Sequence, residues 1–187
     1  NRTQLTKVDT KNEKPTADAI AQFVPHLVVT HPIAALDNLD LYRMMGNLFG
    51  AQARAEKLCD EFRATYRAIT EQIFAERAVL YLIWKDPWMA VARDTYISRT
   101  LELFGLQTLP ESADARYPVI SLEESWLQDV ELVLLSTEPY RFQEKHLDEI
   151  KNTLNKHARL IDGEMTSWYG SRAIQGLRYL ADFSASL

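Results

Sequence analysis

The second half of the chain alternates short apolar runs with longer amphipathic segments. Three of the apolar runs are predicted β-strands, at residues 78–83, 130–135 and 158–161. The amphipathic segments are predicted helices, at residues 94–104, 121–128, 142–155 and 167–183. Strands and helices that alternate in this way form a parallel sheet covered by helices. The sequence therefore predicts an α/β fold.

Each predicted strand runs directly into a loop that carries large apolar and aromatic side chains. These side chains are Trp84, Trp88 and Met89 in the first loop, Tyr140 and Phe142 in the second, and Trp168 and Tyr169 in the third. In α/β sheets, ligands bind in the crevice outside the carboxyl ends of the strands. We therefore expect the three loops to meet at one edge of the sheet and to form a wall for a large, flat, partly apolar ligand.

The overall composition argues against several kinds of partner. The 187 residues carry a formal net charge of −5, whereas nucleic-acid binding requires a basic face. The chain has no apolar run long enough to span a membrane. Its N-terminal stretch is polar and lacks the pattern of a signal peptide. The single cysteine, Cys59, excludes an internal disulfide and is expected to be buried in a helix.

Residues 51–77 form the clearest helical pattern in the chain. This stretch contains no Gly or Pro, and its apolar residues recur in steps of three and four. The apolar positions are Ala55, Leu58, Phe62, Tyr66, Ile69 and Ile73. A helix of this length would extend roughly 40 Å, which is more than one small lobe requires. We therefore expect it to bridge two separate bodies.

Residues 1–50 offer too little structure for a complete lobe. We expect a helix at 17–24 capped by Thr16, a strand at 26–30 and a second helix that runs from residue 33 to between residues 46 and 50. These elements are too few to cover both faces of a parallel sheet. The predicted organisation is therefore an incomplete N-terminal lobe at residues 1–50, a bridging helix at 51–77 and a C-terminal α/β lobe at 78–187.

Four short motifs occur in an order that is typical of one protein family. They are Trp84-Lys85-Asp86-Pro87-Trp88-Met89 with a helix start at Asp94, Arg116-Tyr117-Pro118 with Ser121-Leu122-Glu123-Glu124, Ser136-Thr137-Glu138-Pro139-Tyr140, and Asp162-Gly163-Glu164 with Ser167-Trp168-Tyr169-Gly170. Together they resemble the cobalamin and iron-chelate substrate-binding proteins of ABC importers, in particular the vitamin B12-binding type. The resemblance covers residues 78–183 and, in kind, the 51–77 helix and the segment 18–29. Members of this class, the helical-backbone metal receptors, have two lobes bridged by one long helix.

The resemblance implies two parallel-sheet, Rossmann-like lobes with a corrinoid, haem or ferric siderophore in the cleft between them. The positions that match the family's ligand contacts are Trp84, Trp88, Met89, Tyr117, Tyr140, Trp168 and Tyr169. In vitamin B12-binding members, the aromatic residues at the positions of Tyr117 and Trp168 face the corrin. One acidic residue of each lobe docks onto arginines of the membrane permease, and the matching positions are Asp18 and Glu123. The implied location is the periplasm or the cell surface.

Charged residues near the predicted wall bear on the choice of ligand. Those that could meet an anionic siderophore or haem propionates are Lys85, Arg93, Arg141 and Arg172. Arg172 is the best candidate because it follows Trp168 by one helical turn. The loops also carry Asp86, Glu138, Asp162 and Glu164, so their charge is close to neutral or acidic. This balance favours a corrinoid over a strongly anionic catecholate chelate.

Other functions remain open on the residues alone. The four histidines are scattered and suggest no protein-built metal site, so a metal would arrive inside its chelate and no covalently bound cofactor is expected. The sequence lacks the G-x-G-x-x-G, P-loop and G-x-S-x-G patterns, and we therefore expect a binding protein, not an enzyme. An α/β enzyme that uses the loop carboxylates Glu138, Asp162 and Glu164 is an alternative. A scaffold whose aromatic patch binds protein is another.

Overall fold

The computed structural model describes residues 5–8, 14–111 and 115–187. The chain divides into two compact units, Asn1–Pro32 and Ile33–Leu187, called here the smaller and the larger unit. The division falls earlier in the sequence than the predicted end of the N-terminal lobe at residue 50. Residues 33–50 belong to the larger unit, together with the predicted bridging helix.

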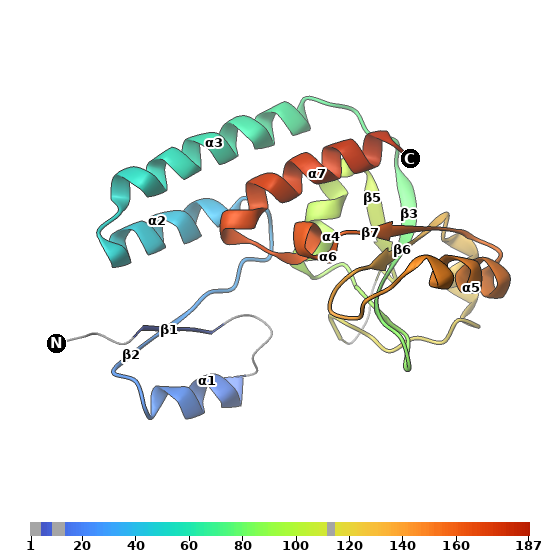
Figure 1. Ribbon diagram of the computed structural model, residues 1–187, viewed down its shortest axis with the longest axis horizontal. Coiled ribbons are helices and arrows are strands. Elements are labelled where there is room, and N and C mark those ends of the chain that lie inside the picture. Colours follow the sequence, from blue (N-terminus) through green and yellow to red (C-terminus); the bar gives the residue numbers. More distant parts are fainter. Residues whose placement is uncertain (1–4, 9–13, 112–114) are drawn as a thin grey trace. The chain divides into compact units, whose positions relative to one another are not determined.

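The smaller unit contains one βαβ arrangement (Figure 1). Strand β1 (Leu5–Val8) pairs in parallel with β2 (His26–Val29), and helix α1 (Lys14–Ala21) connects them. The predicted strand at 26–30 is confirmed, and the predicted helix at 17–24 begins and ends three residues earlier. Strand β1 was not predicted, because its segment is polar and too short to show a clear alternation. Phe23 is 83% exposed and Val29 is 56% exposed.

The larger unit is built around a five-stranded sheet in the order β4-β3-β6-β7, with β5 also paired to β3. The strands are β3 (Arg77–Trp84), β4 (Met89–Ala90), β5 (Leu106–Leu109), β6 (Leu132–Ser136) and β7 (His157–Ile161). All pairs are parallel except β3 with β4. The three predicted strands correspond to β3, β6 and β7, which confirms the parallel α/β fold.

Helices cover both faces of this sheet, and successive residues of β3 point to opposite sides. Val79 and Tyr81 enter a first core, whereas Leu80 and Leu82 enter a second. On the first face lie α2 (Asp37–Phe49), α3 (Gln52–Thr70) and α7 (Ala173–Ala185), and on the second lies α5 (Glu144–Leu154) (Figure 1). This two-sided cover is what a buried parallel sheet requires.

The predicted helix at 51–77 is shorter in the structure. Helix α3 ends at Thr70, so it is about 28 Å long, and Ile73 is fully exposed beyond it. The sequence carries no Gly or Pro to mark this end, and the backbone N–H of Gln72 instead closes a tight turn on the carbonyl of Ile69 at 2.9 Å. Cys59 is fully buried in α3, as predicted. The role of this helix as a bridge between lobes remains a prediction.

Two other predicted helices are interrupted. The 121–128 segment forms only a short 3-10 helix, η2 (Ser125–Asp129). Just before it, the backbone N–H of Ser121 donates to Glu124 Oε1 at 3.0 Å, and the Ser121 hydroxyl accepts from the backbone N–H of Glu123 at 3.2 Å. The 167–183 segment is divided among α6 (Gly163–Ser167), η3 (Gly170–Arg172) and α7.

The remaining predicted helices are close to those observed. The 94–104 segment forms α4 (Tyr96–Leu101) and the 3-10 helix η1 (Glu102–Phe104), and the 142–155 segment forms α5. Thr95 caps α4, because its side-chain oxygen accepts from the backbone N–H of Ser98 at 3.1 Å. Among the described residues, none of the helices has the length and apolar character that crossing a membrane would require.

Candidate ligand-binding site

The three aromatic loops of the larger unit meet at the carboxyl edge of the sheet, because β3, β6 and β7 are parallel and adjacent. The β6 loop contacts the end of β3 through a hydrogen bond from the backbone N–H of Tyr140 to the carbonyl of Ile83 at 3.2 Å. It contacts the β7 loop through Thr137 Oγ1, which accepts from the backbone N–H of Gly163 at 2.9 Å. A Cβ at Gly163 would lie 2.6 Å from the Ser136 hydroxyl, so only glycine allows this close approach.

Rings from the end of β3, from the first two loops and from α5 pack against one another in a group that we call the ring cluster. Its members are Trp84, Trp88, Tyr140, Phe142 and His146. Trp84 meets Tyr140 edge to face with centroids 5.7 Å apart, and Trp88 stacks on Phe142 at 6.2 Å. Phe142 is 2% exposed and belongs to the second core, whereas Trp84 is 40% exposed. The cluster therefore extends from the core to the surface.

The β3 loop is also fixed to α5 by an ion pair. Lys85 Nζ donates to both carboxylate oxygens of Glu149, at 2.5 and 2.6 Å. The hydrogen bond to Glu149 raises the pKa of Lys85 above its ordinary value. The same ammonium group lies 5.5 Å from the centroid of the Trp88 ring. Asp86, which follows Lys85, has a φ of +60° in the left-handed region.

Trp168 is held mainly by polar contacts, in contrast to the ring cluster. It lies directly after α6 and is 45% exposed. Its Nε1–H donates to Glu138 Oε2 at 3.1 Å, and the guanidinium of Arg172 lies 5.7 Å from its ring centroid. Arg172 in turn forms an ion pair with Glu164 at 2.8 Å. Asp162 caps α6, because its side chain accepts from the backbone N–H groups of Glu164 and Met165.

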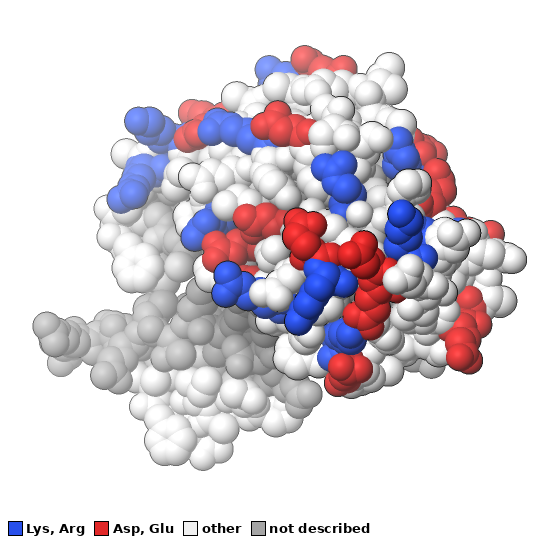
Figure 2. Space-filling view, turned by 45° about the vertical axis from the view of Figure 1, so that its right-hand side comes forward, with Lys and Arg blue, Asp and Glu red and all other residues white. Residues whose placement is uncertain are grey.

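A shallow hollow of about 500 Å³ lies beside Trp168, between the β6 and β7 loops. Its lining residues are Thr137, Glu138, Pro139, Arg141, Asp162, Glu164, Met165 and Arg172. Three carboxylates and two guanidinium groups therefore share one small surface. On the face shown in Figure 2, acidic and basic side chains of the larger unit alternate without forming a large patch of one sign.

Met89 and Tyr117 lie on the side of the sheet opposite to β7. Met89 is part of β4 and bridges to Val119 in the antiparallel sense. Tyr117 is 40% exposed and precedes Val119 by two residues. Because this segment runs toward the carboxyl edge, Val119 lies nearer to that edge than Tyr117 does, and it is 61% exposed. Sequence reasoning did not single out Val119.

Tyr169 contacts a different helix from the one that Trp168 follows. Its ring meets Tyr96 of α4 edge to face, with centroids 5.8 Å apart. The next residue, Gly170, is bound by side chains of α2. The Tyr169 ring therefore contacts α4, whereas its neighbour Trp168 donates to Glu138 of the β6 loop.

The two predicted docking residues lie in different units. Asp18 is exposed on α1 of the smaller unit, and Glu123 is exposed just before η2 of the larger unit. Their role in docking remains a prediction. In the described ranges 5–8, 14–111 and 115–187, no group of three or more His, Cys, Asp or Glu side chains is placed to hold a metal ion.

Sequence reasoning missed two residues that shape the site. His146 completes the ring cluster, and Glu149 anchors Lys85. Phe142 was expected in the wall, and the structure buries it in the second core at 2% exposure. No local pattern pointed to Glu149, because its partner lies 64 residues away in the sequence.

No protein-family model and no curated protein matches this sequence. Solved structures do match it in fold. The periplasmic vitamin B12 binding protein BtuF of Vibrio cholerae superposes with a TM-score of 0.78 at 12% identity, over 97% of this chain and 74% of that one. The periplasmic heme binding protein HutB of Vibrio cholerae gives a TM-score of 0.72 at 16% identity, over 96% and 76%.

A third structural neighbour is a possible iron-binding, periplasmic solute-binding protein from Staphylococcus epidermidis. It gives a TM-score of 0.74 at 16% identity, over 95% of this chain and 74% of that one. The resemblance found in the sequence is thus confirmed at the level of fold. The chain has the α/β fold of periplasmic binding proteins for vitamin B12, iron and heme.

Proposed function

We propose that this chain is the substrate-binding protein of an ABC importer and that it captures a metal-chelate macrocycle, with cobalamin or another corrinoid as the preferred ligand. One observation carries the proposal. Half-exposed aromatic side chains, Trp84 at the end of β3 and Trp168 after α6, stand at the carboxyl edge of the sheet, in a fold shared with vitamin B12 and heme binding proteins.

The geometry of this edge supports a large and flat ligand. The segment of Tyr117 and Val119 lies beside β4, and the strands β3, β6 and β7 follow in order. At about 4.8 Å between neighbouring strands, the row from this segment to β7 is roughly 20 Å wide. Aromatic rings on such a row bury much area at low entropy cost and stack on the face of a macrocycle.

The charges near Trp168 support a corrinoid over a strongly anionic chelate. Of the two cations in the hollow, Arg172 is already paired with Glu164. Three carboxylates surround the same space and would repel a catecholate complex. A ligand whose rim carries mainly neutral amides avoids this repulsion.

A haem or ferric siderophore is the alternative ligand for the same fold. Arg141 and Arg172 line the hollow together, and guanidinium groups bind carboxylates through paired hydrogen bonds. A ligand with one or two carboxylates could displace Glu164 from Arg172. Structural neighbours that are named as heme binding proteins are consistent with this alternative.

We favour binding over catalysis because each candidate catalytic carboxylate has a structural partner. Glu138 accepts from Trp168, Asp162 caps α6, and Glu164 pairs with Arg172. As a binding protein, the chain would hand its ligand to a membrane permease, with Asp18 and Glu123 as the proposed docking residues. The proposed location is the periplasm or the cell surface, as for the neighbours described as periplasmic.

The decisive test is a visible-absorbance spectrum after gel filtration. The protein is mixed separately with cyanocobalamin, haemin and a ferric siderophore, and each mixture is passed through the column. We expect cyanocobalamin to elute with the protein. Retention of haemin or of the siderophore instead would establish the alternative ligand, and retention of none would contradict the proposal and favour an enzyme or a protein-binding scaffold.

A further inference from the structure

We propose that Asn38 and Tyr42 of α2 are positioning residues, which set the orientation of the Trp168–Tyr169 segment by binding both backbone polar groups of Gly170. This inference rests on the proposed function, because Trp168 is one of the proposed ligand contacts. Neither residue is placed to touch a ligand, since Asn38 is fully buried and Tyr42 is 5% exposed.

The contacts of Asn38 use both ends of its amide. Its Oδ1 accepts from the backbone N–H of Gly170 at 2.6 Å. Its Nδ2 donates to the carbonyl of Ala35 at 2.8 Å and to the hydroxyl of Tyr96 at 3.1 Å. A buried amide left without partners costs free energy, so these bonds fix the position of Gly170 relative to α2.

Tyr42 lies one turn further along α2 and binds the other backbone polar group of Gly170. We call Asn38 and Tyr42 together the clamp. The Tyr42 hydroxyl donates to the carbonyl of Gly170 at 2.7 Å. Burial raises the pKa of Tyr42, so the hydroxyl keeps its proton and remains a donor over the physiological range. Both main-chain polar groups of a single residue are thus bound by one helix.

Gly170 is the point where the site segment changes direction. Its φ is +76°, a conformation that other residues adopt only with strain. Trp168 lies between the end of α6 and this turn. Its backbone is therefore held on both sides, by α6 before it and by the clamp two residues after it.

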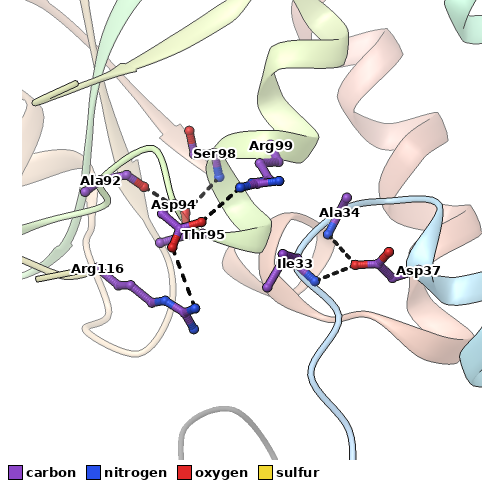
Figure 3. Close-up of polar contacts among 9 residues, drawn as sticks. All are labelled: Ile33, Ala34, Asp37, Ala92, Asp94, Thr95, Ser98, Arg99 and Arg116. Carbon is purple, nitrogen blue, oxygen red and sulfur yellow. Dashed lines mark hydrogen bonds and ion pairs between the residues drawn. The ribbon is translucent and has the colours of Figure 1, made fainter. Parts of the chain in front are cut away.

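The first turns of α2 and α4, which carry Asn38 and its partner Tyr96, are held by hydrogen bonds between side chains and backbone. Asp37 accepts from the backbone N–H groups of Ile33 and Ala34, at 2.8 and 2.9 Å, and this holds the chain that leads into α2 (Figure 3). Thr95 caps α4 directly before Tyr96, and its hydroxyl also donates to the carbonyl of Ala92 (Figure 3). Both Asn38 and its partner Tyr96 therefore project from well-anchored first turns.

The test uses variants that leave the proposed ligand contacts in place. Tyr42→Phe removes one hydroxyl and little volume, and Asn38→Ser removes the longer side-chain amide. Tyr66→Phe is the matched control, because Tyr66 packs against the same core and its ring stacks on Phe62, which Tyr42 also contacts. Each protein is labelled with fluorotryptophan and studied by fluorine NMR, with resonances assigned through single Trp→Phe variants.

We expect the Trp168 resonance to shift or broaden in Tyr42→Phe and in Asn38→Ser, and to stay unchanged in Tyr66→Phe. The resonance of Trp126, which also donates to a carboxylate, should stay in place in all three variants. The dissociation constant for the retained ligand should rise about fivefold in Tyr42→Phe, as expected for one lost buried hydrogen bond.

Two results would overturn the inference. One is a Trp168 resonance that coincides with that of the parent protein in both clamp variants, and the other is a moved resonance with an unchanged dissociation constant. Because Tyr42→Phe changes so little volume, the inference does not depend on whether Asn38→Ser folds. If the parent protein retained no ligand at all, the proposed function would fail. The fluorine spectra would still decide whether α2 sets the orientation of the Trp168 side chain.

Discussion

The two sides of the candidate site hold their aromatic rings in different ways. On the β3 and β6 side, rings pack on rings, and the cluster continues into the second core through the buried Phe142. On the β7 side, Trp168 is 45% exposed and is oriented by Glu138 and Arg172. One side is therefore part of the packed interior, and the other is a surface ring held by polar groups.

This difference separates stability from binding. Truncating a ring in a packed core removes dispersion contacts and leaves a cavity, which destabilises the whole fold. Truncating a half-exposed ring leaves no cavity and should change only what that surface can bind. The β3 and β6 side thus supplies a rigid wall, whereas the β7 side supplies a contact whose role can be tested in isolation.

The largest effect is expected for Phe142→Ala, on the packed side. Phe142 is 2% exposed and contacts the rings of Trp88, Tyr140 and His146. Its loss should lower the free energy of unfolding by about 3–5 kcal/mol. Urea denaturation followed by far-ultraviolet circular dichroism measures this value. A loss below about 1 kcal/mol would mean that the ring cluster is not part of the core.

A large effect on binding, with little effect on stability, is expected for Trp168→Ala. We expect the affinity for the retained ligand to fall at least about tenfold, while the free energy of unfolding changes by less than about 1 kcal/mol. Absorbance titration and urea denaturation give the two quantities. Trp126→Ala is the control, because Trp126 also donates to a glutamate but lies away from the hollow. Unchanged affinity in Trp168→Ala would remove this residue from the site.

The sequence predicted those strands whose pattern of apolar residues matches their burial in the structure. Strands β3 and β6 are buried on both faces and therefore consist of continuous apolar runs. Strand β5 has alternating burial over four residues, and β4 has only two residues. Such short segments carry too little pattern to be distinguished from loops. The end of α3 was missed for a different reason, since no helix-breaking residue marks it.

The candidate site was predictable in its rings but not in their supports. Aromatic residues that follow parallel strands must lie near one sheet edge, so Trp84, Tyr140 and Trp168 could be named from the sequence. Their supports come from remote positions: Glu149 is 64 residues from Lys85, and Asn38 is 132 residues from Gly170. Only tertiary structure brings such pairs together. For the same reason, no local pattern pointed to the contact of Tyr169 with Tyr96 of α4.

The smallest effect is expected for Lys85→Met, which tests whether the packed side needs its ion pair. Methionine keeps an unbranched stem beside Trp88 but loses the bond to Glu149, whose side chain is 37% exposed. The free energy of unfolding should therefore fall by no more than about 1 kcal/mol at neutral pH.

The pKa of Lys85 is raised in the folded protein, so the contribution of the ion pair is fully present below pH 10.5, the ordinary lysine value. It is lost as the pH rises through the raised pKa. Urea denaturation of the parent protein and of Lys85→Met from neutral pH upward should show a constant difference in the free energy of unfolding, which shrinks only above pH 10.5. If that difference were absent at neutral pH, ring packing alone would fix the β3 loop. Polar contacts would then orient a ring only on the β7 side of the site.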